Sequence, residues 1–125
     1  MSLEAAIRNM LDNTAQLAAY PITHGYRPQL STLPAITYEV TSNERSAVAL
    51  YWQAVVDVRV IATTTDAALD IAAFVPSACD TGTYNGLEFT AVMFDGYTID
   101  AASVGEGDEQ QPAEVSNTIT IHYKE

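Results

Sequence analysis

Cysteine and positive charge are both scarce in this sequence. Its single cysteine, Cys79, excludes an internal disulfide, and nothing else points to an oxidising compartment. Lys and Arg together number 5, against 16 Asp and Glu, which gives a net charge of -11. Because so acidic a surface repels phosphate, the composition excludes broad electrostatic binding of nucleic acid.

Long apolar runs are absent too. No run approaches the ~20 residues that a membrane span needs, and Met1-Ser2-Leu3-Glu4 has no basic region before an apolar stretch. We therefore expect no secretory signal and no membrane partner. Nevertheless 48% of the 125 residues are hydrophobic, which is enough to build one core without disulfides. These figures predict a single soluble domain over residues 1–125.

Motifs for phosphate binding or nucleophilic catalysis are missing as well. Neither GxGxxG nor GxxxxGK[ST] occurs, and the glycine pair Gly105-x-Gly107 precedes no helix, so we interpret it as a loop hinge. Cys79 is followed by an aspartate, which raises a thiol pKa instead of activating the thiol. His24 falls in a loop, and His122 falls on the polar side of a strand. We therefore predict no enzyme activity and no cofactor.

Two stretches have helical periodicity. From residue 3 to residue 18, apolar residues recur at three- and four-residue spacing, with Ser2 placed to cap the start and Pro21 to prevent continuation. A second helix is predicted over 66–75, where Asp66 suits the positive end of the helix dipole. The number of alanines in this second stretch indicates close packing against a sheet.

Four stretches alternate with a period of two and predict strands over about 36–40, 48–62, 87–94 and 115–123. In the second of them Trp52 and the valines face inward. Asp57 and Arg59 face outward, where a neighbouring strand could offer each a partner. We interpret 41–46 as a polar turn. Gly96 is interpreted as a break in the strand that starts at 87, and Tyr97, Thr98 and Ile99 could resume that strand.

The order of these elements predicts an α+β fold: a mainly antiparallel sheet of four to five strands with two helices packed on one face. A flexible acidic loop is predicted at about 103–113. Its acids Glu106, Asp108 and Glu109 could offer oxygen ligands to a metal. Their spacing does not fit an EF-hand, so we expect a solvated loop and no metal site.

Several segments, in this order and spacing, resemble the tail terminator (tail-completion, minor tail) family of long-tailed bacteriophages and gene transfer agents. These are the opening helix after Met1-Ser2-Leu3-Glu4 and the strand Leu33-Pro34-Ala35-Ile36-Thr37-Tyr38. The long strand Trp52-Gln53-Ala54-Val55-Val56-Asp57-Val58-Arg59-Val60 and the final strand Ile121-His122-Tyr123-Lys124-Glu125 also match. The chain departs from many relatives in its acidic insertion at 105–112 and in its low arginine content.

This resemblance implies a virion structural protein of the tail or neck, present in the host cytoplasm during assembly, with no catalytic residues. Members of that family form a ring, generally a hexamer, that caps the tail tube and stops its polymerisation. The implied partners are therefore copies of itself, the tail-tube protein and the head-side connector or stopper protein. Viral DNA would pass through the lumen without specific binding.

The residues suggest where such a ring would make its contacts. Head-to-tail rings need two different patches per subunit, and loops with aromatic and basic residues are candidates: Tyr26, Arg27, Leu30, Arg45 and Tyr51. A negative lumen wall keeps a polyanion mobile. Because residues 80–125 hold nine acids and one basic residue, we predict that Glu106, Asp108 and Glu109 face the lumen. Simple solubility is the alternative explanation of those acids.

Two other functions remain open at this point. Another neck component, such as a head-closure or stopper protein, would have similar size and acidity. A small acidic binding or inhibitor module outside the virion would instead be a monomer that binds a basic partner. Assembly state and binding to the tail-tube protein distinguish the three.

Overall fold

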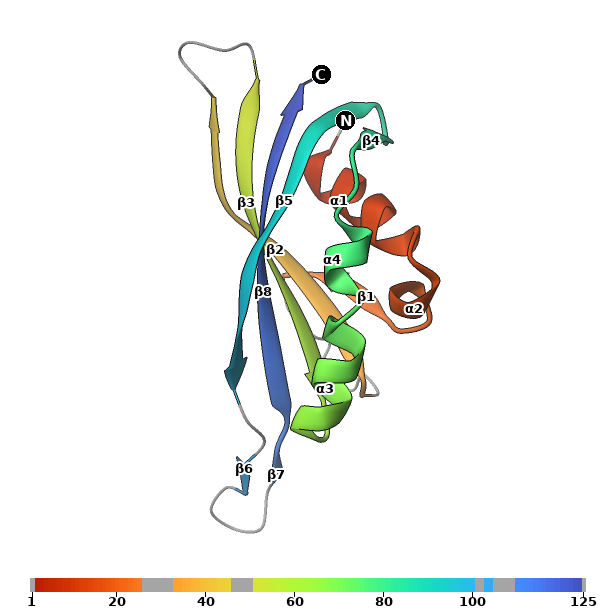
Figure 1. The fold of residues 1–125 in the computed structure, drawn as a ribbon, viewed down its shortest axis with the longest axis vertical. Helices are drawn as coiled ribbons and strands as arrows, with labels where there is room; N and C mark the ends of the chain where they lie inside the picture. Colours follow the sequence, from red (N-terminus) through yellow and green to blue (C-terminus); the bar gives the residue numbers. More distant parts are fainter. Residues whose placement is uncertain (1, 26–32, 46–50, 101–102, 105–109, 125) are drawn as a thin grey trace.

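The sheet has six strands and is mixed. The structure, a computed structural model, describes residues 2–25, 33–45, 51–100, 103–104 and 110–124. Its main sheet has the strand order β1-β2-β3-β8-β5-β4, and the described helices all lie on one face of it (Figure 1). The α+β class and the one-sided helix layer are as predicted, but the strand count of four to five was too low.

The long strands form the centre of the sheet and the short ones its rims. All neighbouring strands pair antiparallel except β1, which runs parallel to β2. The strands are β1 (Ile22–His24), β2 (Ala35–Arg45), β3 (Trp52–Ala62), β4 (Gly82–Tyr84), β5 (Leu87–Asp100) and β8 (Ala113–Lys124). A separate two-stranded ladder joins β6 (Ser103–Val104) to β7 (Gln110–Gln111), so the two ends of the predicted acidic loop pair with each other.

Two strands are longer than predicted. β2 continues through the stretch interpreted as a polar turn, because its backbone stays paired with β3 as far as Arg45, with one register shift between Val40 and Ser42. β5 is interrupted at Gly96 only by a register shift and resumes through Tyr97, Thr98 and Ile99, so it reaches Asp100. This glycine has φ +130 beside a register shift and therefore permits a bulge within the strand.

Each predicted helix is two shorter helices. The first is α1 (Leu3–Asp12) followed by α2 (Ala15–Ala18), with extended backbone at Thr14 between them. The second is α3 (Thr65–Ala72) followed by α4 (Val75–Ala78). Pro76 lacks the N–H that a helix interior requires, so it stands in the first turn of a new helix. Ser2 caps α1 as predicted, and its Oγ accepts from the Ala5 N–H at 3.1 Å.

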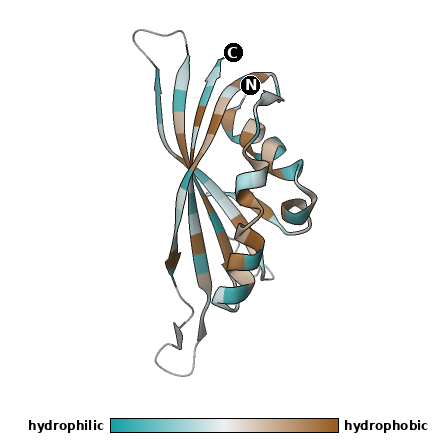
Figure 2. Cartoon of the chain, viewed as in Figure 1, coloured by the Kyte–Doolittle hydropathy of each residue, from teal (hydrophilic) through white to brown (hydrophobic). Residues whose placement is uncertain are grey.

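The core lies between the helix layer and the inner face of the sheet. Hydrophobic and hydrophilic bands alternate along the strands (Figure 2), as expected of a sheet with one buried face. In β8 the inward residues Val115, Asn117, Ile119, Ile121 and Tyr123 are all buried, as the alternation predicted. Trp52 is only half-buried and packs against the core from its border.

One predicted contact is wrong. Asp57 and Arg59 were expected to find partners on neighbouring strands, but the Arg59 Nε donates to the Asp57 Oδ2 at 2.9 Å within β3 itself. Their cross-strand neighbours explain this result. Glu39 stands opposite Asp57, and Thr37 and Ser116 stand opposite Arg59, so no opposite charge is directly across the ladder.

Candidate assembly surfaces

The sheet face away from the helices carries most of the described acids. The cross-strand register places six acids and two cations on that face, and Asp95 joins them because the outward-facing Thr120 hydroxyl donates to its carboxylate. We call this surface the acidic face. Its acids are Glu39, Glu44, Asp57, Glu88, Asp95, Asp100 and Glu114, and all of them are exposed or half-buried. Both cations are already paired, Arg59 with Asp57 and Lys124 with Glu88.

Like charges stand directly opposite one another on the acidic face. Glu39 is in register with Asp57 across β2 and β3, and Asp100 is in register with Glu114 across β5 and β8. Such pairs destabilise a sheet by roughly 0.2–1 kcal/mol each. An arrangement that lowers stability in this way is typical of a surface that serves a function.

The end of the sheet where β2 ends and β3 begins carries two of the interface residues predicted from the sequence. Arg45 is exposed at the last position of β2, in register with Trp52. Tyr51 is half-buried, and its ring stacks on His122 with the centroids 4.7 Å apart. His122 lies on the polar side of β8, as predicted, and Tyr51 is its packing partner there.

Aromatic rings support this end from the core side. Trp52 stacks on Tyr123, and Tyr123 contacts Phe89, which in turn contacts Tyr84. The Tyr123 hydroxyl also donates to the Asn43 Oδ1 at 2.9 Å and so ties β8 to β2. The end of β2 at Arg45 and the start of β3 beside Tyr51 therefore lie on a part of the sheet that these side-chain contacts stabilise.

The remaining predicted surface residues fall in segments outside the description. Tyr26, Arg27 and Leu30 of the candidate ring interface, and the candidate lumen acids Glu106, Asp108 and Glu109, lie outside the described residues. Their predicted roles stay predictions. The acidic face, by contrast, is a larger group of acids that the sequence analysis did not gather into one surface.

The candidate nucleophile is poorly suited to catalysis. Burial raises the pKa of the Cys79 thiol to about 11, and the carboxylate of Asp95 adds to the shift. The upward shift of the thiol pKa agrees with the prediction. The acid that contributes to it is Asp95 and not the adjacent Asp80. The Cys79 thiol donates to the Val75 carbonyl at 3.4 Å.

The other candidate ligands and catalytic groups are also dispersed. The His24 ring contacts Tyr38. Among the described residues, no three His, Cys, Asp or Glu side chains are placed to hold a metal.

No helix in the described part of the chain is long and apolar enough to span a membrane.

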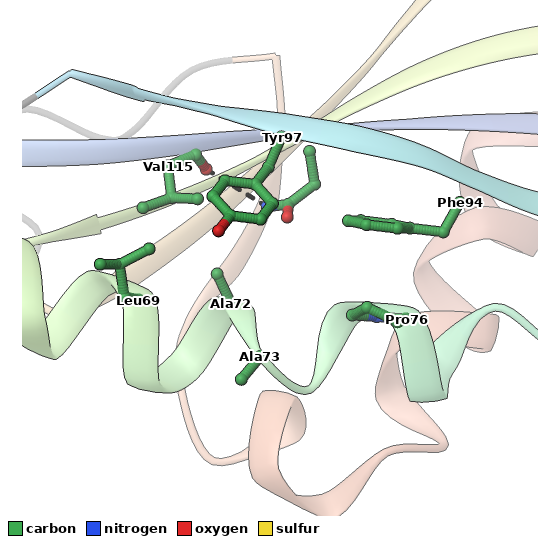
Figure 3. Close-up of a pocket in the computed structure, with 8 residues that line it drawn as sticks. Leu69, Ala72, Ala73, Pro76, Phe94, Tyr97 and Val115 are labelled. Atoms are coloured by element: carbon green, nitrogen blue, oxygen red, sulfur yellow. Dashed lines mark hydrogen bonds between the residues drawn. The ribbon is translucent and has the colours of Figure 1, made fainter.

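A groove lies between the helix layer and β5 (Figure 3). Its volume is ≈ 320 Å³, and its lining is mostly apolar: Leu69, Ala72, Ala73, Pro76, Phe94, Tyr97, Val115 and Asn117. Tyr97 is 56% exposed and Ala73 and Pro76 are exposed, so the groove is open to solvent. Sequence reasoning missed this site, although the lone Asn117 on the inward face of an apolar strand was a signal of it.

Asn117 is the polar exception in the groove lining. Its side chain is 1% exposed, and its Nδ2 donates to the carbonyls of Val58 at 3.0 Å and Val115 at 3.3 Å. Its Oδ1 is buried and accepts no hydrogen bond from any described residue. A buried acceptor without a donor costs about 1–3 kcal/mol.

Over the described residues, these features define an α+β domain with a curled six-stranded main sheet, helices on one face of it and acids on the other. No family model matches the sequence. A search among curated proteins also gives no match. Among solved structures, a chain described as "Virion of native gene transfer agent (GTA) particle" has the same fold. The TM-score is 0.69 at 13% sequence identity, over 99% of this chain and 96% of that one. At this identity the likeness shows the fold alone.

Proposed function

We propose that this chain is a virion structural protein that forms a ring at the end of a tail tube, stops its polymerisation and joins it to the head. The observation that carries the proposal is the full-length likeness in fold to a chain of a gene transfer agent virion. The order of sequence segments that resemble tail terminators supports the same function independently. The proposed partners are other copies of the chain, the tail-tube protein and the head-side connector.

The acidic face supports the lumen part of this proposal. DNA that moves through a ring needs a wall that does not bind it, and negative charge on that wall repels phosphate and leaves the counterions in place. Seven acids and two already paired cations lie on one side of the sheet, on the face that the described helices leave uncovered. We therefore propose the acidic face, together with the predicted loop acids, as the wall of the lumen.

A test of the ring function measures tube length directly. Tail-tube protein is allowed to polymerise in vitro with and without this chain, and the products are measured by negative-stain electron microscopy. The proposal predicts shorter tubes with one ring-shaped density at an end. Tubes of unchanged length, with the chain bound only to the connector, would instead identify a head-closure or stopper protein. A monomer that binds neither would favour the inhibitor module.

A test of the lumen wall reverses charges on one face at a time. Asp100→Lys combined with Glu114→Lys changes the acidic face, and Asp70→Lys combined with Asp80→Lys makes the same change of charge on the helix side. We expect the first pair to lower the number of infectious or DNA-transferring particles while assembly continues, because the lumen would then bind DNA. The second pair should leave the yield unchanged. Equal losses from both pairs would contradict the lumen assignment.

A further inference from the structure

The groove beside β5 combines a free strand edge with an unsatisfied acceptor. β4 pairs only with Leu87–Phe89 of β5, so from Ala91 to Asp100 this strand has β8 on one side and no described strand on the other. Unpaired N–H and C=O groups along such an edge are a template for an added strand. The groove between β5 and α3 lies on the inner side of that edge.

The residues that line the groove determine which type of side chain would fit into it. Phe94, Tyr97 and Leu69 offer apolar surface to a large side chain. The Asn117 Oδ1 requires one hydrogen-bond donor, because both hydrogens of its amide nitrogen are already committed to carbonyls. A side chain that is large and apolar but ends in a single N–H or O–H, such as tyrosine or tryptophan, meets both requirements.

The acids along β5 determine which residues should flank the tyrosine or tryptophan of the added strand. In an added strand, alternate side chains point to the outer face of the sheet, where Asp95 and Asp100 lie along β5. Lysine or arginine at those alternate positions would be attracted to these acids. Two β5 edges pairing with each other would instead bring acids together, which is unfavourable.

The chain itself has few cations to offer such an edge. It contains only 5 basic residues, and three of them are already in ion pairs: Arg8 with Asp12, Arg59 with Asp57 and Lys124 with Glu88. An edge that repels its own copy and needs basic residues favours a different protein as its occupant.

We propose that the β5 edge and the groove beside it bind an extended segment of another protein by strand addition. In that segment lysine or arginine alternates with apolar residues, and one tyrosine or tryptophan enters the groove and donates to the Asn117 Oδ1. The site does not depend on the ring function proposed above. If that function holds, the segment belongs to one of the two neighbours of the ring in the virion.

The binding test uses the full-length chain and a synthetic peptide in which lysine alternates with valine around one central tyrosine. Binding is followed by isothermal titration and by chemical-shift changes in β5 and α3. Ala73→Leu fills the groove from an exposed position, and Ala5→Leu makes the same change on an exposed site of α1. We expect saturable binding that Ala73→Leu weakens at least roughly tenfold, which is about 1.4 kcal/mol, and that Ala5→Leu leaves unchanged.

Peptide variants test each part of the recognition. Replacing the central tyrosine by phenylalanine should weaken binding several-fold to the natural chain and not at all to Asn117→Leu, because only the natural chain has the acceptor. If Asn117 only stabilised the fold, the tyrosine peptide would bind more tightly than the phenylalanine peptide by the same ratio in the natural chain and in Asn117→Leu. Replacing the lysines by glutamates, or methylating the backbone nitrogens that face β5, should abolish binding.

Several results would overturn the proposal. One is no binding at peptide concentrations on the order of 1 mM, and another is equal binding to the natural chain and Ala73→Leu. A third is self-association of the free chain that Ala73→Leu abolishes, since the occupant would then be a second copy. Because the readout is peptide binding, a failure here leaves the tube-length test unaffected, and a failure of that test leaves this site standing.

Discussion

At the residue scale, a few side chains determine where elements begin. Thr64 has extended backbone at the start of α3, and its Oγ1 accepts from the Ala67 N–H at 3.1 Å. This bond satisfies one of the backbone donors that a helix leaves free at its N-terminus. Thr64 is therefore the N-cap of α3.

Thr64→Ala removes this cap. We expect the free energy of unfolding to fall by about 1 kcal/mol, measured by urea denaturation followed by circular dichroism. Thr64→Ser keeps a hydroxyl in the same position and should recover most of the loss. If the serine variant is as unstable as the alanine variant, the hydroxyl is not the cause.

Cys79 provides a pH test. Because burial raises the pKa of its thiol from 9.0 to about 11, the folded state holds the thiol proton more tightly than the unfolded state does. Its contribution to stability is therefore fully present below pH 9 and is lost as the pH rises toward about 11. Iodoacetamide should label the folded chain slowly at pH 9 and faster as the pH approaches 11, while the urea-unfolded chain labels readily at pH 9. Fast labelling of the folded chain at pH 9 would contradict the assignment.

For Asn117, the sequence pattern predicted which way the side chain points but not its hydrogen bonds. The alternation of β8 placed its side chain on the inward face, and it is buried there. The pattern could not predict that its Nδ2 bonds the Val58 carbonyl, 59 positions away in sequence, while its Oδ1 has no described partner. Hydrogen-bond satisfaction depends on tertiary neighbours, and a local pattern does not contain them.

At the element scale, the long strands were predictable and the short ones were not. β3 and β8 alternate over 11 and 12 residues, so one register of burial fits them and the inward faces were correct. β1 and β4 have three residues each, too few to show a period, and they form only because β2 and β5 provide an edge. The mixed character of the sheet follows from β1 alone.

Gly96 was predicted to interrupt the strand, and it is part of a bulge inside β5. Gly96→Ala forces an L side chain into φ +130, although a Cβ there would meet no atom within 4 Å. The cost is therefore one of backbone strain, on the order of 1–3 kcal/mol, with no steric clash. Thr98→Ala, at an exposed position of the same strand, should cost far less. Thermal denaturation of the two variants compares them, and equal losses would mean that the conformation of Gly96 is not required.

At the scale of the whole molecule, the acidic face links stability to the proposed function. Asp100 and Glu114 are in register and carry like charges. Glu114→Lys creates an opposite pair and should raise the free energy of unfolding by up to about 1 kcal/mol, measured by urea denaturation at low salt. The same variant should lower particle yield if the face lines the lumen. Glu114→Gln should give about half of the stabilisation, and a loss of stability in the lysine variant would contradict the like-charge account.

The whole-molecule properties that the sequence could predict are those that composition and the order of the elements control. Net charge, the absence of disulfides and the α+β class need no knowledge of tertiary contacts. The gathering of seven acids on one sheet face depends on the register of β2, β3, β8 and β5, which includes bulges that shift which residues face outward. For this reason the sequence analysis assigned the lumen only to the acidic loop and missed the face.

Electron cryomicroscopy of assembled particles tests the central claim most directly. The account predicts several copies of this chain in a closed ring at the end of the tail tube, with Asp57, Asp100 and Glu114 turned toward the DNA path. A ring whose helix layer lines the channel, or particles without this chain at the tail end, would contradict it.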